Sequence, residues 1–353
     1  MKTLAAVLEK INNPLRIEEL TVPELKHGQV LVKIAYSGIC HSQLNEIGGL
    51  KGEDRFLPHT LGHEGSGVVA AIGESVKKVK VGDLVVLTWL KGSGIDVPSC
   101  QYLKGNGGIV NSGAISTFLT KAVVSENRVV RIPDGIPLKE AALFGCAIPT
   151  GAGIVIKAIK KGYANSIAIF GLGGIGLSAL LAARMIGVPS IIGVDKFEYK
   201  LEKARQLGAT DIINAKKGGV LSCIMEITAG KGVDYAVECS GSRAMMEAAF
   251  QSVRDKGGLC IITGNLPQGD KISIDPFNLI KGKGIVGAWG GGTNPDIDIP
   301  MYADLYLSGK LKIGELIGDM CSLSNINKAL NKLKKGTGGR ILINMGPSQR
   351  FKK

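Results

Sequence analysis

The fold is decided by residues 167–195, which read IAIFGLGGIGLSALLAARMIGVPSIIGVD. Four apolar residues lead into a glycine-rich turn, an apolar segment with helical spacing follows, and a second short apolar run ends at Asp195. The glycines of the turn are Gly171, Gly173, Gly174 and Gly176. This order predicts a strand, a tight turn, a helix and a second strand, which together begin a parallel α/β sheet.

The turn has the spacing Gly-x-Gly-x-x-Gly, which is typical of dinucleotide binding. The first glycine allows the tight turn, the second lets the backbone approach a pyrophosphate, and the third lets the helix lie close to the strand. Asp195 follows the turn by about 20 residues, where its carboxylate would accept hydrogen bonds from ribose hydroxyls. This carboxylate would repel a 2′-phosphate, so the sequence favours NAD over NADP. The alternative is a structural glycine turn followed by a surface Asp.

Strands and helices alternate through the following hundred residues. The pattern predicts strands at 167–170, 191–194, 211–213, 234–239, 258–263 and 284–289, and helices at 175–186, 197–207, 219–229 and 242–254. Such alternation predicts one doubly wound parallel sheet of the Rossmann type, which we assign to a domain at residues 148–292.

The first 130 residues have a different pattern, with short alternating runs separated by Gly, Pro and charged turns. Strands are expected before residue 35 and at 65–72, 84–88 and 118–130, which predicts a mostly β domain. A helical turn is expected at 138–143, and the helical spacing at 149–159 predicts the link between the domains. Helical pieces at 299–308 and 324–334 and a strand at 340–344 are expected to return to the first domain, giving it residues 1–147 and 293–353. We expect the polar, basic residues 346–353 to be disordered.

Composition points to a soluble enzyme. The chain has 353 residues, of which 45% are hydrophobic and 21% charged, as in ordinary globular proteins of two domains. No signal-peptide pattern or membrane-length apolar run is present, which predicts a cytoplasmic protein without a membrane partner. The net charge is +13, but the lysines are scattered and no arginine-rich or aromatic-interleaved stripe occurs. We therefore expect no nucleic-acid partner.

Three residues form a candidate metal site: Cys40, His63 and Cys146. Two thiolates and one imidazole suit Zn²⁺ in tetrahedral geometry, and a site with three protein ligands leaves the fourth position open for water or substrate. Taken singly, each residue has a plainer explanation, because a Cys in an apolar segment and a lone His are usually structural.

Several motifs together resemble the zinc-dependent alcohol dehydrogenases of the medium-chain dehydrogenase/reductase superfamily. These motifs are GICHSQLN at 38–45, LGHEGSGVV at 61–69, VGDLVV at 81–86, GCAIPTG at 145–151, FGLGGIGLSA at 170–179 and VDKFEYK at 194–200. The likeness runs from about residue 5 to residue 345. It implies an α/β fold with a Rossmann sheet and a mostly β, GroES-like catalytic domain.

The resemblance also implies roles for individual residues. The implied zinc ligands are Cys40, His63 and Cys146; the implied catalytic residues are Ser42, which takes the proton of the alcohol, and Glu64, an acid beside the metal; the implied cofactor contacts are His41, Thr150, Gly171, Gly173, Gly174, Ile175, Gly176, Asp195, Lys200 and Arg340. An alcohol bound to zinc as its alkoxide would transfer hydride to NAD and become an aldehyde or ketone.

The sequence departs from the family pattern at three places. Residues 88–111 contain only Cys100, so we expect one catalytic zinc ion and no structural zinc. Asn45 replaces the histidine of the usual proton relay, and Gln43 replaces the acid that usually supports the metal-bound histidine. The route of the proton and the support of His63 are therefore open at this point.

Two other functions are alternatives to the dehydrogenase. One is a zinc-independent quinone or enone reductase of the same superfamily that uses NADPH, against which the three ligands and Asp195 both speak. The other is a non-catalytic nucleotide or nucleic-acid binder, which only the positive charge suggests.

The substrate and the partner are less determined. Trp89 falls where the family has an aromatic wall, and Asn111 and Ser112 favour a polar secondary alcohol, a sugar or a polyol, unless both simply face solvent. Residues 283–291, KGIVGAWGG, match the edge strand through which family members pair, so the expected assembly is a homodimer, with a homotetramer as the other family form.

Overall fold

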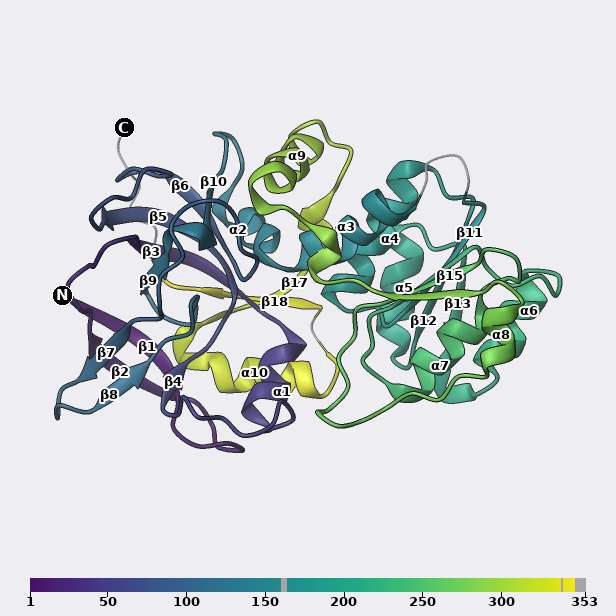
Figure 1. Ribbon diagram of the computed structural model, residues 1–353, viewed down its shortest axis with the longest axis horizontal. Coiled ribbons are helices and arrows are strands. Elements are labelled where there is room, and N and C mark those ends of the chain that lie inside the picture. The colour runs from purple at the N-terminus through teal and green to yellow at the C-terminus, as the bar shows by residue number, and fades with distance from the viewer. Residues whose placement is uncertain (160–163, 338, 347–353) are drawn as a thin grey trace. The chain divides into compact units, whose positions relative to one another are not determined.

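The chain folds into two compact units in the computed structural model, which describes residues 1–159, 164–337 and 339–346 (Figure 1). The first unit holds residues 1–146, 294–308 and the described residues from Ile317 on; the second holds 147–293 and 309–316. The sequence placed 309–316 in the first unit. The structure places them in the second, where Leu311 and Ile313 are buried and the turn Ile313–Leu316 contacts the helix Gly174–Ile186. The tail at 347–353, expected to be disordered, lies outside the described residues.

The second unit is built on a parallel sheet with the strand order β13-β12-β11-β14-β15-β16. Its strands are β11 (Ser166–Phe170), β12 (Ser190–Asp195), β13 (Asp211–Asn214), β14 (Tyr235–Glu238), β15 (Leu259–Ile262) and β16 (Gly284–Gly287). The order reverses between β11 and β14, and ligands of such sheets bind beside this point, at the carboxyl ends of the strands. The doubly wound sheet predicted from the sequence is confirmed.

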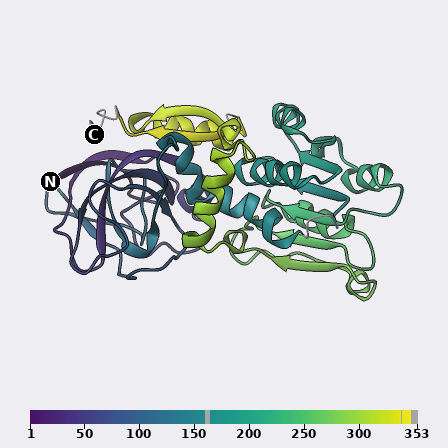
Figure 2. The ribbon, with the colours of Figure 1, turned by 90° about the horizontal axis from the view of Figure 1, so that it is seen from above.

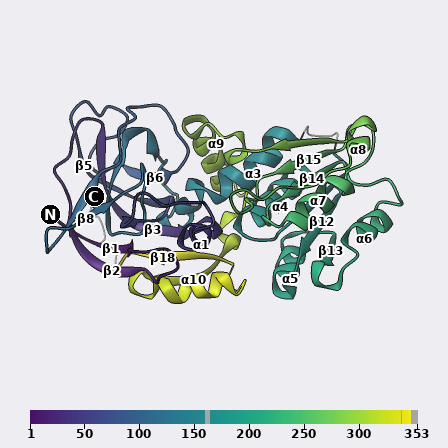
Figure 3. The same ribbon diagram turned by 60° about the horizontal axis from the view of Figure 1, so that its bottom comes forward.

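Helices flank this sheet (Figure 3). They are α3 (Ala147–Ala158), α4 (Gly174–Ile186), α5 (Glu198–Leu207), α6 (Val220–Ile227), α7 (Arg243–Ser252) and α8 (Pro276–Ile280). Of these helices, only α8 was not predicted from the sequence. Its start is nevertheless encoded, because the Asp275 side chain accepts a hydrogen bond from the Phe277 N–H and Pro276 occupies the first helical position.

The first unit combines a closed barrel with a second, larger sheet. The barrel order is β1-β2-β7-β8-β4, and the sheet order is β10-β6-β5-β3-β18-β17, with β9 paired to β3. The strands are β1 (Lys2–Leu8), β2 (Arg16–Thr21), β3 (Gln29–Ile39), β4 (His59–Thr60), β5 (Glu64–Ile72), β6 (Leu84–Thr88), β7 (Gln101–Lys104), β8 (Ile109–Asn111), β9 (Lys121–Ser125), β10 (Val129–Arg131), β17 (Ile317–Ser322) and β18 (Arg340–Asn344). Figure 2 shows β17 and β18, in yellow, beside helix α10 (Ile326–Lys334).

The strand predicted at 118–130 is wrong in its extent. The structure divides it into β9 and β10, with a 3-10 turn at Glu126–Arg128 between them. The Glu126 carboxylate is buried there and accepts hydrogen bonds from the N–H groups of Lys77, Lys78 and Ile95. A buried carboxylate that binds three donors of other loops fixes its own backbone, and so interrupts the strand.

The first unit contains further helical segments besides α10. They are α1 (His41–Ile47), α2 (Leu138–Ala141) with the 3-10 turn η2 (Ala142–Gly145), and α9 (Pro295–Leu307). Helix α1 was not predicted, because it is short and begins at a cysteine. Among the described residues, no single helix is long and apolar enough to cross a membrane, although the bent pair Leu138–Gly145 and Ala147–Ala158 reaches that length in combination.

Candidate metal centre

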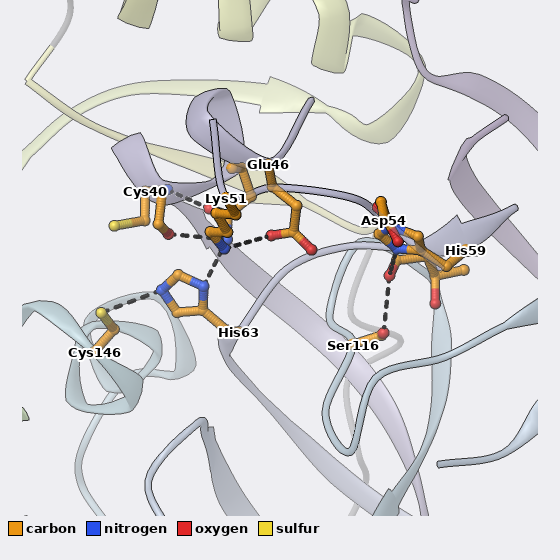
Figure 4. Close-up of polar contacts among 11 residues, drawn as sticks. Cys40, Glu46, Lys51, Asp54, His59, His63, Ser116 and Cys146 are labelled. Atoms are coloured by element: carbon orange, nitrogen blue, oxygen red, sulfur yellow. Dashed lines mark hydrogen bonds and ion pairs between the residues drawn. The ribbon is translucent and has the colours of Figure 1, made fainter. Parts of the chain in front are cut away.

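Three side chains of the first unit converge on one point. Cys40 follows β3, His63 precedes β5 and Cys146 follows η2, and their ligand atoms all lie within 4.8 Å of one another. The Nε2 atom of His63 lies 3.2 Å from Sγ of Cys146. Figure 4 shows both sulfur atoms on the same side of the His63 ring. The structure thus brings together the three ligands that the sequence singled out.

A close backbone approach places Cys146 beside His63. A Cβ atom on Gly145 would lie 2.3 Å from the carbonyl oxygen of Leu87 and 2.8 Å from Cα of Glu64. Only glycine fits in this space, and it allows η2 to lie against β5 and β6. Cys146, the next residue, therefore reaches the histidine at the start of β5.

The two thiols share one local environment. A hydrogen bond from Cys146, helped by Arg340 and His63, holds the pKa of Cys40 well below its ordinary range. The same hydrogen bond, together with burial, raises the pKa of Cys146. A cysteine whose pKa is lowered in this way suits a soft cation, which binds the thiolate form.

A buried ion pair acts electrostatically on both cysteines. Arg340 Nε donates to Oε1 of Glu64 over 2.7 Å, and both side chains are almost fully buried. Burial lowers the pKa of Arg340, but Glu64, Cys40 and Cys146 outweigh it, so the net shift is upward. The resemblance gave Arg340 to the cofactor and Glu64 to the metal, and the structure pairs them with each other.

Gln43 supports the histidine of the centre. Its Nε2 atom lies 2.6 Å from Nδ1 of His63, and its Oε1 atom accepts a hydrogen bond from the Cys40 N–H over 2.8 Å. His41, Ser42 and Asn45 lie on the same helix, α1, and Ser42 Oγ is 3.4 Å from the Gln43 amide nitrogen. The position that the sequence left in doubt is therefore occupied by a direct partner of His63.

Cys100 lies apart from this centre, in the barrel. Its side chain is buried, and burial raises its pKa to about 11. A thiol that stays protonated at neutral pH behaves as an apolar core group. Asn111 and Ser112 also make hydrogen bonds within the first unit, with Phe56 and Gly113 respectively, which favours structural roles for both.

The glycine turn of the second unit has the geometry that dinucleotide binding needs. Gly171 has φ +87°, and a Cβ there would lie 2.7 Å from the Ser240 nitrogen; a Cβ on Gly176 would lie 1.9 Å from the Gly171 oxygen. A Cβ on Gly173 would meet nothing within 4 Å, so this position is open for a ligand. Gly173 caps α4, and Gly174 and Ile175 begin that helix, whose free N–H groups suit a pyrophosphate.

Asp195 ends β12 at the carboxyl edge of this sheet. Its carboxylate accepts hydrogen bonds from the N–H groups of Leu172 and Phe197, at 2.8 and 3.0 Å, and lies 3.7 Å from the Lys200 ammonium. Burial lowers the pKa of Lys200, although Asp195 opposes this shift. On α3, the Thr150 hydroxyl is buried and has no hydrogen-bond partner among the residues that the structure describes. A buried hydroxyl of this kind fits a site that a polar ligand completes.

Two features near this turn were not predicted. Glu238, at the end of β14, is fully buried and binds the turn at Ser240 and Gly241, a role for which the sequence offered only the pattern of an acid after an apolar strand. Lys196, Lys200 and Lys216 lie 5.0 to 5.4 Å from the centre of the Phe197 ring. Lys196 and Lys200 belong to the motif at 194–200, but Lys216 does not. The contact of Lys216 with Phe197 therefore could not be predicted from that motif.

Known proteins share this arrangement. Residues 26–134 match the family model of the alcohol dehydrogenase GroES-like domain, and residues 174–306 match that of the zinc-binding dehydrogenases. The chain is 32% identical to alcohol dehydrogenase 1 of Trifolium repens over 373 aligned residues, which cover 98% of this chain and 97% of the relative. This chain belongs to the zinc-type alcohol dehydrogenase family of the medium-chain dehydrogenase/reductase superfamily. The resemblance read from its motifs is confirmed.

Solved structures agree with this membership. The chain resembles benzyl alcohol dehydrogenase from Acinetobacter calcoaceticus, with a TM-score of 0.87 and 31% identity. It also resembles an alcohol dehydrogenase zinc-binding domain protein from Burkholderia ambifaria, with a TM-score of 0.89 and 31% identity. Each comparison covers 98% of this chain and 100% of the other. The fold class is confirmed, and the family is one of oxidoreductases that act on alcohols with zinc and a nicotinamide cofactor. It does not favour the zinc-independent reductase.

Proposed function

We propose that this dehydrogenase oxidises an alcohol to an aldehyde or ketone with one zinc ion and NAD. The observation that carries the proposal is the convergence of two sulfur atoms and one imidazole nitrogen within 4.8 Å. The donor set fits zinc, because thiolate and imidazole are its preferred ligands and three of them leave a position for substrate.

Each residue of the centre has a defined task in this reaction. Cys40, His63 and Cys146 would hold the zinc ion, which supplies Lewis acidity that makes a bound alcohol easier to deprotonate. The Ser42 hydroxyl would take the proton of the alcohol. Asn45, one turn further along α1, does not titrate, so the proton leaves through water or the cofactor ribose.

The second unit would bind NAD. The open position at Gly173 admits the pyrophosphate, Asp195 binds the adenosine ribose, and Thr150 and Ile175 line the nicotinamide. Lys200 would contribute positive charge to the cofactor. Asp195 would carry the preference for NAD, because its carboxylate would repel the 2′-phosphate of NADP.

An alcohol panel tests this proposal. Primary alcohols, benzyl alcohol, secondary alcohols and polyols are offered with NAD or NADP, with and without a chelator, and reduced cofactor is followed by absorbance. We expect NAD-dependent turnover that the chelator abolishes. Turnover that survives removal of the metal would contradict the zinc mechanism, and a preference for benzyl alcohol or ethanol over polyols would exclude the polar substrate class.

The Cys146→Ser variant separates the metal from the cofactor. Serine is a poor zinc ligand, so the variant should lose zinc and turnover. Cys146 belongs to the first unit and the glycine turn to the second, so NAD binding, measured by calorimetry, should change little. Retained turnover in a variant shown to be zinc-free would overturn the assignment.

We also propose that the chain forms a homodimer through β16. This strand lies at one edge of the parallel sheet, and large apolar side chains near it are exposed: Phe277, Ile280, Val286 and Trp289. An apolar edge strand is normally covered, because its free backbone groups otherwise pair with other chains. A second copy of the same strand would cover it, either in a dimer or in a tetramer built from two dimers.

A further inference from the structure

We propose that Gln43 sets how tightly the centre holds zinc. Its hydrogen bond to Nδ1 of His63 favours the tautomer with the proton on Nε2, the nitrogen that faces Cys146, and a protonated nitrogen cannot bind a metal. The proposal rests on the zinc site described above and concerns the residue behind it. Gln43 is a positioning residue, since it touches His63 and Cys40 through hydrogen bonds only.

The side-chain amide of Gln43 faces two groups at once. It is 1% exposed, with Oε1 2.8 Å from the Cys40 nitrogen and Nε2 2.6 Å from His63 Nδ1. The first contact closes the N-terminus of α1 in the manner of a capping box, in which a glutamine three residues into the helix binds the capping residue. This contact also fixes which way the amide points.

The hydrogen-bond network then determines the tautomer of His63. A backbone N–H can only donate, so the Gln43 oxygen must face Cys40 and the NH₂ group must face His63. Nδ1 is therefore an acceptor, and the ring proton lies on Nε2, which is 3.2 Å from Cys146 Sγ. In this arrangement each of these groups has a partner.

Zinc binding changes the requirement at both ring nitrogens. A zinc ion among Cys40, His63 and Cys146 would take the lone pair of Nε2, so the proton of the neutral ring would move to Nδ1. Nδ1–H would then meet the Gln43 NH₂ group, which is also a donor. If the amide turns over, its NH₂ group meets the Cys40 N–H instead, so either arrangement leaves one buried donor unpaired.

A carboxylate at position 43 would remove this conflict. Its two oxygens can accept from the Cys40 N–H and from His63 Nδ1–H at the same time. Partners of metal-bound histidines typically change metal affinity by about 10- to 100-fold when they are altered. We therefore expect Gln43→Glu to bind zinc about 10- to 100-fold more tightly than the natural protein.

Competition with a chromophoric chelator measures this affinity on the full chain. The matched control is Asn45→Asp, which adds the same negative charge to α1 without facing His63. Gln43→Glu should tighten zinc binding well beyond Asn45→Asp, whose effect reports the charge alone. Equal affinities for the two variants, or no gain for Gln43→Glu, would overturn the role of Gln43. If neither the natural protein nor Gln43→Glu takes up zinc, the proposed zinc centre fails as well.

The tautomer itself is measurable in the natural protein, which avoids any effect of substitution on folding. The chain has 4 histidines, so ¹⁵N imidazole spectra are simple to assign. At about pH 8, above the ordinary titration range of histidine, we expect metal-free His63 to carry its proton on Nε2 and zinc-loaded His63 on Nδ1. A metal-free spectrum with the proton already on Nδ1 would overturn the proposal.

Discussion

Glu64 and Arg340 are charged residues beside the metal centre that are not among its three ligands. Their side chains are 0% and 5% exposed, and they form an ion pair with each other. The resemblance had assigned Arg340 to the cofactor and Glu64 to the metal. A buried cation that loses its partner keeps the full cost of its desolvation. We therefore expect the Glu64–Arg340 ion pair to stabilise the fold around the metal centre, independently of any role in turnover.

Removing one partner should expose this requirement. We predict that Glu64→Gln lowers the free energy of unfolding of the metal-free protein by about 3 kcal/mol or more, because Arg340 stays buried without an opposing carboxylate. Urea unfolding measures the change. Glu53→Gln is the control: its pair with Arg55 is exposed, so no measurable loss is expected. Equal losses in both variants would show that the buried pair has no special weight.

Glu238 gives a second prediction, on pH dependence. Burial raises its pKa above the ordinary value near 4.5, although hydrogen bonds from Ser240 and Gly241 oppose the shift. The folded protein thus binds this proton more tightly than the unfolded chain. The stability from this protonation is complete below the unfolded pKa and is lost as pH rises through the folded pKa.

The Glu238→Gln variant should not show that loss. Gln keeps an oxygen for the Ser240 turn and does not ionise, so the natural protein should lose stability relative to the variant as pH rises above about 4.5. Thermal unfolding across pH measures the difference between them. Glu226→Gln, at an exposed position of α6, is the control. A difference that stays constant with pH would contradict the raised pKa of Glu238.

At the scale of elements, the glycine turn between β11 and α4 contains one glycine that the fold requires, Gly171, and one that we expect only cofactor binding to require, Gly173. We predict that Gly171→Ala destabilises the protein, because its φ is +87° and the new methyl group would meet the Ser240 backbone. Gly173→Ala should fold normally, since its Cβ position is open, yet bind NAD at least about tenfold more weakly because the methyl group blocks the pyrophosphate. Thermal unfolding and NAD titration of both variants test this. Normal NAD binding by Gly173→Ala would contradict a pyrophosphate at the turn.

The elements that the sequence predicted best are those with local, repeated signals. The parallel strands are continuous apolar runs and the helices between them have clear periodicity, so β11 to β15 were located within one or two residues. Helix α1 was missed, because its capping signal is Cys40 with Gln43 rather than a common capping residue. The strand at 118–130 was overextended, because its interruption depends on loops that bind Glu126 from elsewhere in the chain.

The site shows the same division. The glycine turn could be derived from spacing alone, since all its parts are local. The metal ligands come from three segments that are distant in the sequence. Only the resemblance to a family predicted that they form one site. The contacts of Gln43 with His63 and of Glu64 with Arg340 are long-range, and no pattern within one segment of sequence encodes them.

At the scale of the whole molecule, the exposed edge of the second unit predicts its assembly. Ile280 and Trp289 are 78% and 80% exposed, and Val286 lies on the edge strand itself. Isolated apolar residues on a surface are ordinary, but several beside a free strand edge are costly in water and favour association. A dimer that pairs two copies of β16 would satisfy both the side chains and the backbone.

Light scattering of the purified protein tests this assembly. We predict a mass of twice 37.0 kDa, or four times if dimers pair, and a shift toward 37.0 kDa in a variant with Ile280→Asp and Val286→Asp, because two buried carboxylates at a two-fold interface would be duplicated and unpaired. Phe56→Asp, at a 67% exposed position of the first unit, should leave the mass unchanged. A natural protein that is monomeric would contradict the homodimer. A double variant that keeps its full mass would show that the interface lies elsewhere and does not cover the apolar edge of β16.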